Sequence, residues 1–544
     1  MSIILGISGG FIHRVLNPAA SLIINGKLVF AQEEERLNRI KNSRGLMPTN
    51  AIREALIYKK LNIKDVDFVA FNSKYLKLKK QLNSYFNFNF GYCPKIYMVD
   101  HHTCHAYSAY FPSKFKESNI ITIDYSGNGI STTLSYGKEN KIKLIKEIKK
   151  PNSLGIFYGL ITQLLGYEID NDEYKVMGLA SYGKPYFDFD KILKINKHGY
   201  FLNKKIINKT ELNPKKSLNL TTEEPFYSNE LLKYFNLKKR FSKKSKSQKK
   251  INLAASAQNQ LNKAIVKLAE LIYEKTGSHN FCLAGGVALN CTANGYLSNL
   301  DFVQKMYIQP AASDAGGSLG AALYIANKLK NKISLNENFY LGNSFNNKQI
   351  KETLKNNGIL NLTKKFNHTF IARQLSKSKV IGFFNGRHEF GPRALGNRSI
   401  LANPKNKLMK KILNKKIKFR EDFRPFAPIV LKEHANKYFD LKKGIDYSSM
   451  TITCIAKKLA QKKLPSCVHF DKTSRVQVLD YKKNPKLGQI LKEFGRITGE
   501  PVLINTSFNL NGRPNVNTPD QAISTFYSSG MDYLVLGDYV LSKK

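Results

Sequence analysis

The chain has 544 residues, which is enough for two or three domains with sizeable cores. Its composition, 42% hydrophobic and 23% charged, is that of a globular protein, and no apolar run approaches the ~18 residues of a membrane span. The six cysteines form no CxxC pair, which excludes a zinc ribbon and argues against a disulfide scaffold. Because the first residues also lack the pattern of a signal peptide, we expect a reduced protein in the cytoplasm.

The charge is strongly unbalanced, because 87 basic residues against 40 acidic ones give a formal net charge of +47. One interpretation is a polyanionic partner such as nucleic acid or an anionic lipid surface. The other is a compositional drift towards Lys, Asn and Ile, which spreads solvated charges over the surface. Short segments rich in these residues recur along the whole chain, so the second interpretation is favoured and no specific nucleic-acid partner is expected.

Two hairpins of the same design are predicted in the first 140 residues. Residues 4–8 form an apolar strand, and residues 20–36 contain an Asn25-Gly26 turn between two apolar runs. Residues 119–137 repeat the order of strand, polar glycine turn and strand. Repetition of this kind indicates an internal duplication.

The stretch around residue 100 combines a strand, a helix start and two histidines. Residues 95–99 are apolar, and Asp100 is a good N-cap for the helix that follows. His101 and His105 then lie four residues apart on one helix face, where two imidazoles can bind one metal ion. Neutral imidazole suits iron, zinc, copper or nickel. The alternative is a partly buried histidine pair that is satisfied by the backbone.

Two isolated aspartates offer the remaining ligands of such a site. Asp124 and Asp314 each follow an apolar run where a strand is expected to end. Two histidines with two carboxylates would suit a divalent, iron-like ion that keeps positions open for a substrate.

The rest of the first 330 residues alternates helices, strands and glycine turns. Lys175 lies among apolar neighbours and either snorkels or points at an anion. The pattern weakens over about 187–250, a basic stretch that is either a nucleic-acid arm or, in our interpretation, a surface insertion; a long helix follows over 251–277. Gly285-Gly286 is expected to open a helix directly after a strand, which places N–H groups where a phosphate or nucleoside could bind.

A second domain is expected after the weakly patterned stretch 334–364. Its short loops carry a basic set in surroundings rich in Gly, Pro and Phe, namely Arg393, Arg398, Lys418, Arg424 and Arg475. Arginine is favoured where planar, bidentate contact with phosphate or carboxylate is needed. A solvated charged face is the alternative, but most other cations of this chain are lysines.

Nine strings in fixed order resemble one family, the O-carbamoyltransferases of the nodulation-factor and aminoglycoside or cephem antibiotic type. The strings are EEER, VDHHTCHAYSA, DEYKVMGLASYG, CLAGGVALN, QPAASDAGGSLGAAL, GRHEFGPRALGNRSIL, FREDFRPFAP, TSRVQV and NTSFN. The resemblance covers essentially the whole chain, and ordered matches are far more specific than a single motif.

The resemblance implies an α/β fold with two domains. Residues 1–350 would form a duplicated domain like that of actin, Hsp70 and sugar kinases, with a variable basic insertion at about 187–250. Residues 365–544 would form an α+β domain with a mixed, twisted sheet. The implied reaction has two steps: the second domain makes carbamoyl-adenylate from carbamoyl phosphate and ATP, and the first transfers the carbamoyl group to a hydroxyl of a sugar or secondary metabolite.

The same resemblance assigns the site residues. An Fe(2+) ion would be bound by His101, His105, Asp124 and Asp314. Nucleotide contacts in the first domain would fall on Lys175, Gly285, Gly286, Asn290 and Gly316. Carbamoyl phosphate and ATP, with Mg(2+), would contact Arg393, Lys418, Arg424 and Arg475, and also Asn505 and Ser507 of a loop formed by the string NTSFN. His13, which follows the first glycine pair, is predicted to accept the proton of the attacking hydroxyl.

Three other functions are compatible with parts of the pattern. Threonylcarbamoyl transfer to tRNA uses the same two domain types and would suit the positive charge. The hydrogenase-maturation carbamoyltransferase is disfavoured, because its acylphosphatase domain and zinc-type cysteines are missing from this sequence. A nucleotide-binding chaperone or kinase-like scaffold would need the glycine loops but not the histidine pair and the arginine set. The sequence names neither the acceptor nor the oligomeric state, for which a homodimer is one option.

Overall fold

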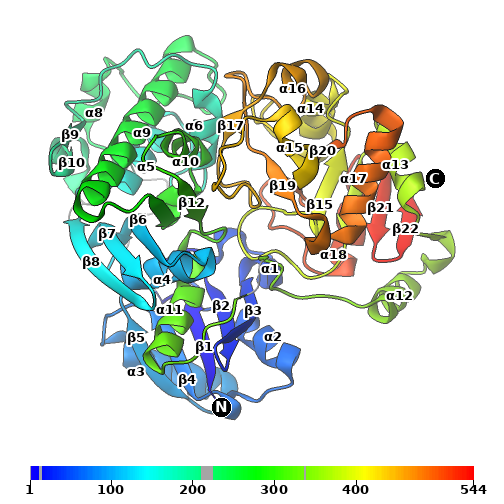
Figure 1. The fold of residues 1–544 in the computed structure, drawn as a ribbon, viewed down its shortest axis with the longest axis horizontal. Helices are drawn as coiled ribbons and strands as arrows, with labels where there is room; N and C mark the ends of the chain where they lie inside the picture. The colour runs from blue at the N-terminus through cyan, green and yellow to red at the C-terminus, as the bar shows by residue number, and fades with distance from the viewer. Residues whose placement is uncertain (1, 12–14, 210–224, 336–337, 544) are drawn as a thin grey trace. The chain divides into compact units, whose positions relative to one another are not determined.

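The structure is a computed structural model that describes residues 2–11, 15–209, 225–335 and 338–543 (Figure 1). The chain forms two compact units, each with a mixed α/β architecture. The first comprises Met1–Val29, Asn42–Leu335 and Lys443–Ile445, and the second comprises Phe30–Lys41, Asn336–Lys442 and Asp446–Lys544. Among the described residues, no helix is both long enough and apolar enough to pass through a lipid bilayer.

The first five strands form one sheet, in the order β3-β2-β1-β4-β5. Strands β1 to β5 span Ile3–Ser8, Ala19–Ile24, Lys27–Glu33, Phe68–Asn72 and Lys95–Val99. Strand β1 runs antiparallel to β2 and parallel to β4, which is itself parallel to β5. The predicted Asn25-Gly26 turn joins β2 to β3, and its positive φ angles of 49° and 77° are those of a type I′ hairpin.

The second sheet of the first unit repeats this topology. Its order is β12-β11-β6-β7-β8, with β6 antiparallel to β7 and parallel to β11, which is parallel to β12. Strands β6, β7, β8, β11 and β12 span Glu117–Gly127, Ile130–Lys138, Lys141–Lys149, Asn280–Ala284 and Lys305–Ile308. Its hairpin also turns on an Asn-Gly pair, Asn128-Gly129. The duplication predicted from the repeated strand–turn–strand pattern is therefore confirmed in the strand topology.

Two helices, α4 (His101–Ser113) and α11 (Asp314–Lys328), occupy equivalent places in the two repeats. Helix α4 begins directly after β5, and α11 follows β12, so that each comes after the last parallel strand of its sheet. Helix α4 packs against β6 and β11, α11 packs against β1, β2 and β4, and the two helices pack against each other (Figure 1). The centre of the first unit is thus a pair of helices between two sheets.

Other helices of the first unit are α2 (Thr49–Lys59), α3 (Leu78–Phe90), α5 (Leu154–Leu164), α6 (Glu173–Ala180) and α9 (Gln248–Thr276). One local prediction is wrong. Gly286 opens only a 3₁₀ turn, and the helix α10 (Cys291–Ser298) begins after Asn290, whose side chain caps it.

The basic stretch at about 187–250 contains ordered elements in its described part. They are β9 (Leu193–Asn196), β10 (Gly199–Leu202) and α8 (Asn229–Tyr234), while residues 210–224 lie outside the description. The predicted first domain, 1–350, also contains residues 30–41, which here pack with the second unit.

The second unit is built on one eight-stranded sheet in the order β13-β22-β21-β14-β15-β20-β16-β19. In chain order these strands span Lys364–Lys365, Ile381–Phe384, Arg398–Ala402, Ala427–Leu431, Gln477–Leu479, Val502–Ser507, Tyr533–Leu536 and Tyr539–Ser542. The pairs β14 with β21 and β16 with β19 are parallel, and the other neighbouring strands are antiparallel, so the sheet is mixed, as predicted. A short pair, β17 (Cys454–Ile455) and β18 (Thr473–Ser474), lies outside this sheet.

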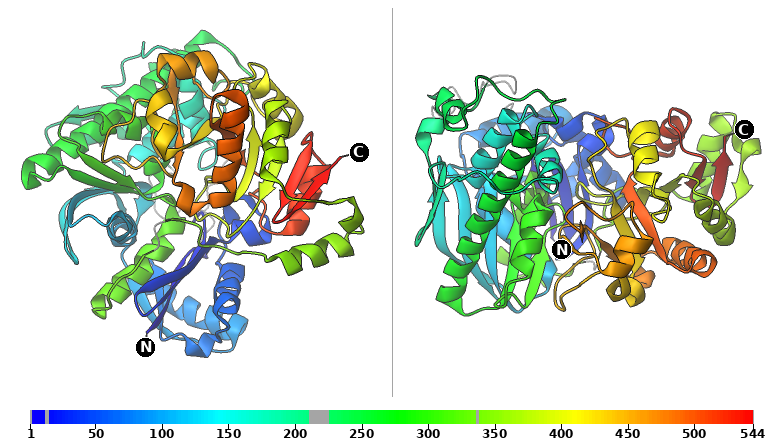
Figure 2. Two further views of the ribbon diagram at one scale, coloured as in Figure 1. Left: turned by 45° about the vertical axis from the view of Figure 1, so that its right-hand side comes forward. Right: turned by 90° about the horizontal axis from the view of Figure 1, so that it is seen from above.

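Helices cover both faces of the eight-stranded sheet. The helices of this unit are α1 (Glu35–Asn38), α12 (Asn347–Asn356), α13 (His368–Ser376), α14 (Met409–Ile412), α15 (Lys432–Tyr438), α16 (Lys458–Lys463), α17 (Pro485–Thr498) and α18 (Pro519–Tyr527). Phe383 and Leu401 face a core under α13 and α17, which pack side by side (Figures 1 and 2). Their neighbours Phe384 and Ile400 face a second core with α12, α14 and α18. Because successive side chains of β14 and β15 point to opposite faces, these strands are packed on both sides, which fixes the position of the loop between them.

Candidate functional site

A cluster of four side chains in the first unit brings together the residues predicted to bind a metal. His101 and His105 lie in the first turns of α4, and the Asp100 Oδ1 caps this helix by accepting a 3.0 Å hydrogen bond from the Thr103 N–H. Because they are four residues apart, the two imidazoles share one helix face, and their Nε2 atoms lie 3.1 Å apart.

Asp124 reaches this pair from strand β6. The pairing of β6 with β7 is irregular between Ile123 and Gly127, and an interruption of this kind re-aims side chains. The Asp124 Oδ2 lies 3.1 Å from His101 Nε2 and 3.0 Å from His105 Nε2. Gly127 leaves room for the first histidine, since a Cβ at this position would lie 1.9 Å from the His101 ring.

Asp314, the first residue of α11, completes the cluster. Its Oδ1 lies 3.7 Å from the Nε2 atoms of both His101 and His105. The four donor atoms, one from each side chain, all lie within 4.8 Å of one another. Ligand atoms held about 2.1 Å from one divalent ion lie about 3.0–3.5 Å apart at octahedral or tetrahedral angles, so this donor set fits a single ion.

The cluster attracts positive charge. Burial alone would lower the pKa of His105, but hydrogen bonds and charge interactions with Asp124 and Asp314 raise it to about 9. The neighbouring His102 differs, because burial and the other two imidazoles lower its pKa to about 3. His105 Nδ1 is buried and has no hydrogen-bond partner among the described residues. Two carboxylates that face two imidazoles therefore form a natural binding site for a cation.

Two of the residues predicted to contact a nucleotide, Gly286 and Lys175, each lie beside an aspartate of the first unit. Gly286 lies beside the cluster, since a Cβ added there would be 3.1 Å from Asp124 Oδ1. Lys175 is buried and forms a 2.7 Å ion pair with Asp172, so its ammonium group already faces an anion of the protein.

The other three nucleotide-binding candidates donate hydrogen bonds within the protein. The Gly285 N–H donates to the Ala312 carbonyl at 2.8 Å, and the Gly316 N–H donates to the Ala311 carbonyl at 3.0 Å. The Asn290 amide donates to Gln258 Oε1, also at 3.0 Å. These N–H groups are therefore already paired, and the nucleotide contacts of all five residues stay predictions. His13, the predicted proton acceptor, lies outside the described residues.

In the second unit, Lys418 is buried at the end of a π-helical turn. Its ammonium group donates to the carbonyl and hydroxyl oxygens of Ser507, and to the Asn509 carbonyl at 3.0 Å and Asn509 Oδ1 at 2.9 Å. Burial, with the nearby Arg420 and Arg424, lowers the pKa of Lys418, whereas these oxygen atoms favour its charged form. Lys418 thus fixes the end of strand β20.

The arginines of the predicted basic set differ in their surroundings within the second unit. Arg393 is half-buried in the loop between β14 and β15, and Arg424 faces Glu421 at 3.6 Å. Arg475 forms no hydrogen bond or ion pair in the part of the chain that the structure describes.

Asn505 and Ser507 lie on strand β20, whereas the sequence pattern predicted a loop at these positions. Asn505 is buried and donates to the Ala394 carbonyl at 3.2 Å and to Gln477 Oε1 at 2.6 Å. Its carbonyl oxygen, Oδ1, has no partner among the described residues.

Arg398 is buried, and its guanidinium group donates hydrogen bonds to backbone carbonyls of the protein. It donates to the carbonyls of Asn385, at 2.7 Å, and Gly386, at 3.1 Å, and its guanidinium lies 3.6 Å from the centre of the Phe384 ring. Burial lowers its pKa to about 9. This arginine therefore supports the backbone of the β14–β15 connection.

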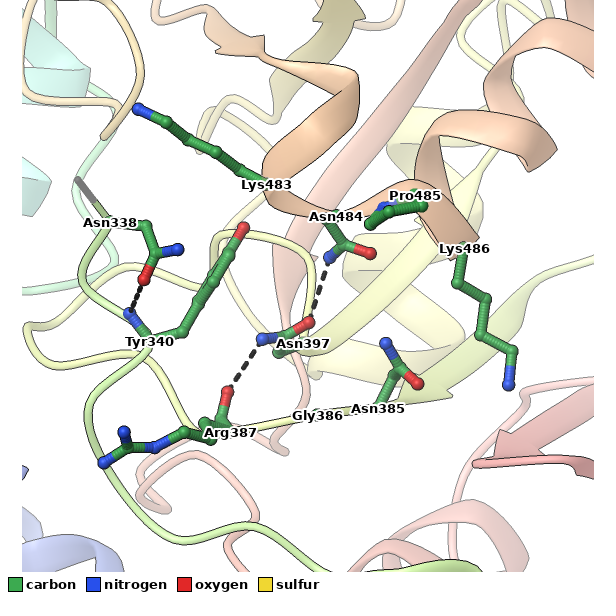
Figure 3. A pocket seen from close by; sticks show the side chains of 10 residues that line it. All are labelled: Asn338, Tyr340, Asn385, Gly386, Arg387, Asn397, Lys483, Asn484, Pro485 and Lys486. Atoms are coloured by element: carbon green, nitrogen blue, oxygen red, sulfur yellow. Dashed lines mark hydrogen bonds between the residues drawn. The ribbon is translucent and has the colours of Figure 1, made fainter. Parts of the chain in front are cut away.

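A pocket of about 490 Å³ is lined in part by the same connection (Figure 3). Asn484 Nδ2 donates to Asn397 Oδ1 at 2.9 Å, and Asn397 Nδ2 donates to the Arg387 carbonyl at 2.8 Å. Figure 3 shows Tyr340 beside these amides, and the lining residues include no carboxylate. None of the predicted phosphate-binding residues lines this pocket.

Comparison with known proteins decides the family. Residues 75–323 match the family model described as carbamoyltransferase N-terminus, and residues 372–543 match the model described as carbamoyltransferase C-terminus. The chain belongs to the carbamoyltransferase family.

Relatives of this carbamoyltransferase extend over its full length. An uncharacterised protein from Synechocystis is 34% identical over 100% of this chain and 97% of its own. Nodulation protein NolNO from Sinorhizobium fredii is 32% identical over 99% of this chain and 82% of its own. The solved structure of HypF from T. kodakarensis, with 14% identity and a TM-score of 0.33 over 60% of this chain and 48% of its own, is too distant to identify a shared fold. The resemblance stated from the sequence is confirmed at the family level, and the protein is a transferase.

Two buried glutamates of the carbamoyltransferase were missed by sequence reasoning. Glu33 and Glu389 both bond the backbone of the loop that carries Arg393. The available signal was their position inside two of the matched strings, EEER and GRHEFGPRALGNRSIL. In the structure, both carboxylates accept backbone hydrogen bonds from this loop and its end.

Proposed function

We propose that this carbamoyltransferase is an ATP-dependent O-carbamoyltransferase that acts in the cytoplasm. In its first step, carbamoyl phosphate, ATP and water give carbamoyl-adenylate, phosphate and pyrophosphate in the second unit. In its second step, a hydroxyl of a sugar or secondary metabolite attacks the carbamoyl carbon. The bond from that carbon to the AMP oxygen breaks, AMP leaves, and the hydroxyl proton passes to a base.

The observation that carries this proposal is the cluster of His101, His105, Asp124 and Asp314. Attack on a carbamoyl group places negative charge on its carbonyl oxygen, and stabilising that charge is the main task of the site. A divalent ion held by these four side chains, Fe(2+) in our proposal, would supply Lewis-acid stabilisation. Helices α4 and α11 both begin at the cluster, so that the positive ends of their dipoles favour the same negative charge.

Residues of the second unit bind the anionic substrates in this proposal. Arg393, Arg424 and Arg475 contact the phosphates of carbamoyl phosphate and ATP, for which Mg(2+) is the counterion. Lys418 holds the end of strand β20, where Asn505 and Ser507 offer polar groups to the donor. The buried, unpartnered oxygen of Asn505 suits an amide N–H such as that of a carbamoyl group.

Transfer in the first unit needs a base and a place for the adenylate. We assign proton acceptance to His13, because histidine is the side chain that commonly does this near neutral pH. The nucleotide part of the adenylate is assigned to Lys175, Gly285, Gly286, Asn290 and Gly316. Replacing His13 by Ala should slow transfer by about 10²–10⁴-fold and leave adenylate formation unchanged; loss of adenylate formation would contradict the assignment.

We further propose that the first unit has the fold of actin, Hsp70 and the sugar kinases. The support is its topology, in which two sheets with the same strand order enclose two equivalent helices. In a fold of this kind the duplicated halves offer glycine turns to a nucleotide from both sides, which suits the transfer of an adenylate-linked group.

The proposed reaction is tested by pyrophosphate exchange. Protein purified without oxygen is incubated with ATP, Mg(2+) and labelled pyrophosphate, and label entering ATP is measured with and without carbamoyl phosphate. The proposal predicts exchange only when carbamoyl phosphate is present. Formation of ADP without any exchange would contradict the adenylate and indicate transfer of the γ-phosphate.

Threonylcarbamoyl transfer to tRNA remains the second candidate, because the net charge of +47 suits a nucleic-acid acceptor. Titration with bulk tRNA at physiological salt distinguishes the two. We expect only the non-specific affinity of about 10⁻⁴–10⁻⁶ M that a basic surface gives. Tighter, sequence-dependent binding would favour tRNA as the acceptor.

A further inference from the structure

Directly before the Arg393 loop, residues 390–397, lies a buried carboxylate that the proposed reaction does not use. Glu389 is 1% exposed, and a single oxygen of it, Oε1, accepts three backbone hydrogen bonds. The donors are the N–H groups of Leu395 at 2.9 Å, Asn397 at 2.8 Å and Arg398 at 3.1 Å. A carboxylate oxygen that accepts hydrogen bonds from three N–H groups within four residues fixes the backbone that presents them.

The other end of the loop is held by the string EEER from the N-terminal part of the chain. Glu33 Oε1 accepts the Gly391 N–H at 2.9 Å, and Arg36 Nη2 donates to the Gly391 carbonyl at 2.9 Å. Arg36 also faces Glu33 at 3.4 Å and Glu35 at 2.8 Å. All three EEER side chains in these contacts are buried, so water does not weaken them.

This pair of contacts is costly for the fold. Glu33 and Glu389 each keep one carboxylate oxygen that is buried without a hydrogen-bond partner among the described residues. Burying a charged group in this state is unfavourable, even with the compensating charges of Arg36 and Arg398 nearby. Neutral side chains would be sufficient to close a turn. The use of two buried charges indicates that this loop must hold one conformation.

We propose that Glu33 and Glu389 are positioning residues that hold the Arg393 loop at both ends, so that Arg393 meets the phosphate of the carbamoyl donor. The inference rests on the proposed function for the role of Arg393. It explains why EEER, more than 300 residues from GRHEFGPRALGNRSIL in sequence, accompanies that string. Arg393 lies between the two fixed ends, two residues after Gly391 and two before Leu395.

We call the contacts by which Glu33 and Glu389 hold the two ends of the Arg393 loop the clamp. The clamp is tested by hydrogen exchange of the full-length protein carrying Glu389→Gln. Glutamine keeps the size and the accepting oxygen but removes the charge, and hydrogen bonds to charged acceptors are about twice as strong as neutral ones. We expect amide exchange of Leu395, Asn397 and Arg398 to rise about tenfold. Glu352→Gln, on the exposed surface of α12, is the matched control and should leave these amides unchanged. Equal exchange in wild type and the Glu389 variant would overturn the clamp.

The role of the clamp in donor binding is tested by a double-mutant cycle. The KM for carbamoyl phosphate in pyrophosphate exchange is measured for Glu389→Gln, Arg393→Ala and the double variant. We expect the KM to rise about tenfold and about 100-fold in the single variants, with kcat changed much less. If Glu389 acts through Arg393, adding Glu389→Gln to Arg393→Ala raises the KM by less than about twofold.

Two results would overturn the inference, and they are distinguishable. Effects that multiply in the double variant would show that Glu389 does not act through Arg393, while the proposed donor site would stand. An unchanged KM in Arg393→Ala would show that this arginine does not bind the donor, so that both the assigned site and the inference fail. Glu33→Gln serves as the second variant should Glu389→Gln fold poorly, and the same criteria apply to it.

Discussion

Each unit of the molecule contains a fully buried histidine, and the charged groups that shift its pKa most differ in sign between the two units. In the first unit, two carboxylates face His105 and raise its pKa to about 9 against the effect of burial. In the second unit, burial and the guanidinium groups of Arg36 and Arg398 hold the pKa of His388 well below its usual range. The first unit is therefore built to attract a cation, and the interior of the second unit is built from cations that bind carbonyl and carboxylate groups.

This contrast shows how differently acidic and basic residues can be interpreted. The donor atoms of His101, His105, Asp124 and Asp314 all lie within 4.8 Å of one another, an arrangement that could hold one ion. Several basic residues in Gly- and Pro-rich loops instead bind the protein: Lys418 bonds Ser507 and Asn509, and Arg398 bonds backbone carbonyls. Charge alone therefore does not separate a substrate-binding cation from a structural one.

The largest expected effect comes from removing a carboxylate of the cluster. Asp124→Ala should lower the rate of carbamoyl transfer by at least about 10³-fold, because the developing charge loses its main stabilisation. Carbamoyl phosphate-dependent pyrophosphate exchange, which we assign to the second unit, should stay within about twofold of wild type. Carbamoylation of a surrogate hydroxyl acceptor such as glycerol, with the accompanying release of AMP, measures the transfer step.

The matched control for Asp124→Ala is Asp301→Asn, an exposed aspartate of the same unit. It should change neither the transfer rate nor the exchange rate. Loss of both activities in Asp124→Ala, with normal thermal unfolding, would mean that the two steps are not divided between the units.

A smaller effect is expected from the basic set of the second unit. Arg424→Ala should reduce pyrophosphate exchange by about 10²-fold, since a charge-assisted contact with phosphate contributes about 1.5–3 kcal/mol. Its metal content should remain that of wild type. Arg496→Ala, an exposed arginine of α17, is the control. Exchange at the wild-type rate in Arg424→Ala would show that Arg424, like Arg398, serves only the fold.

The sequence predicted those features that repeat or have fixed spacing. The repeated order of strand, polar glycine turn and strand predicted the duplication, and in the structure both turns are Asn-Gly pairs, which type I′ turns strongly favour. The i, i+4 spacing of His101 and His105 placed both on one helix face. The two aspartates could be proposed only because each follows an apolar run, and their meeting at the helix pair depends on long-range packing.

The rest depended on contacts that are remote in sequence. No local pattern shows that residues 30–41 pack with the second unit, or that Glu33 bonds Gly391. Gly285 and Gly286 have the pattern of a helix start, but only a 3₁₀ turn, Gly286–Leu289, follows, and the Gly285 N–H donates to the remote Ala312 carbonyl. Asn505 and Ser507 were placed in a loop because a run of polar residues conceals the end of a strand.

The smallest effect concerns stability and pH. His388 is neutral in the fold and becomes protonated below pH 6.5 when unfolded, so the unfolded state binds more protons and stability falls as the pH falls. At pH 5 this histidine should cost about 2 kcal/mol relative to pH 7.5. His388→Gln should therefore lose less stability than wild type between these pH values in urea unfolding. Parallel pH dependence of wild type and His388→Gln would contradict the neutral state of this histidine.

The central claim is that His101, His105, Asp124 and Asp314 hold one divalent ion. The most direct measurement is elemental analysis of protein purified without oxygen, for wild type, His105→Ala and the control His198→Ala, an exposed histidine of the same unit. The account predicts close to one equivalent of iron in wild type and the control, and less than about a tenth of an equivalent in His105→Ala. Equal metal content in all three proteins would contradict it.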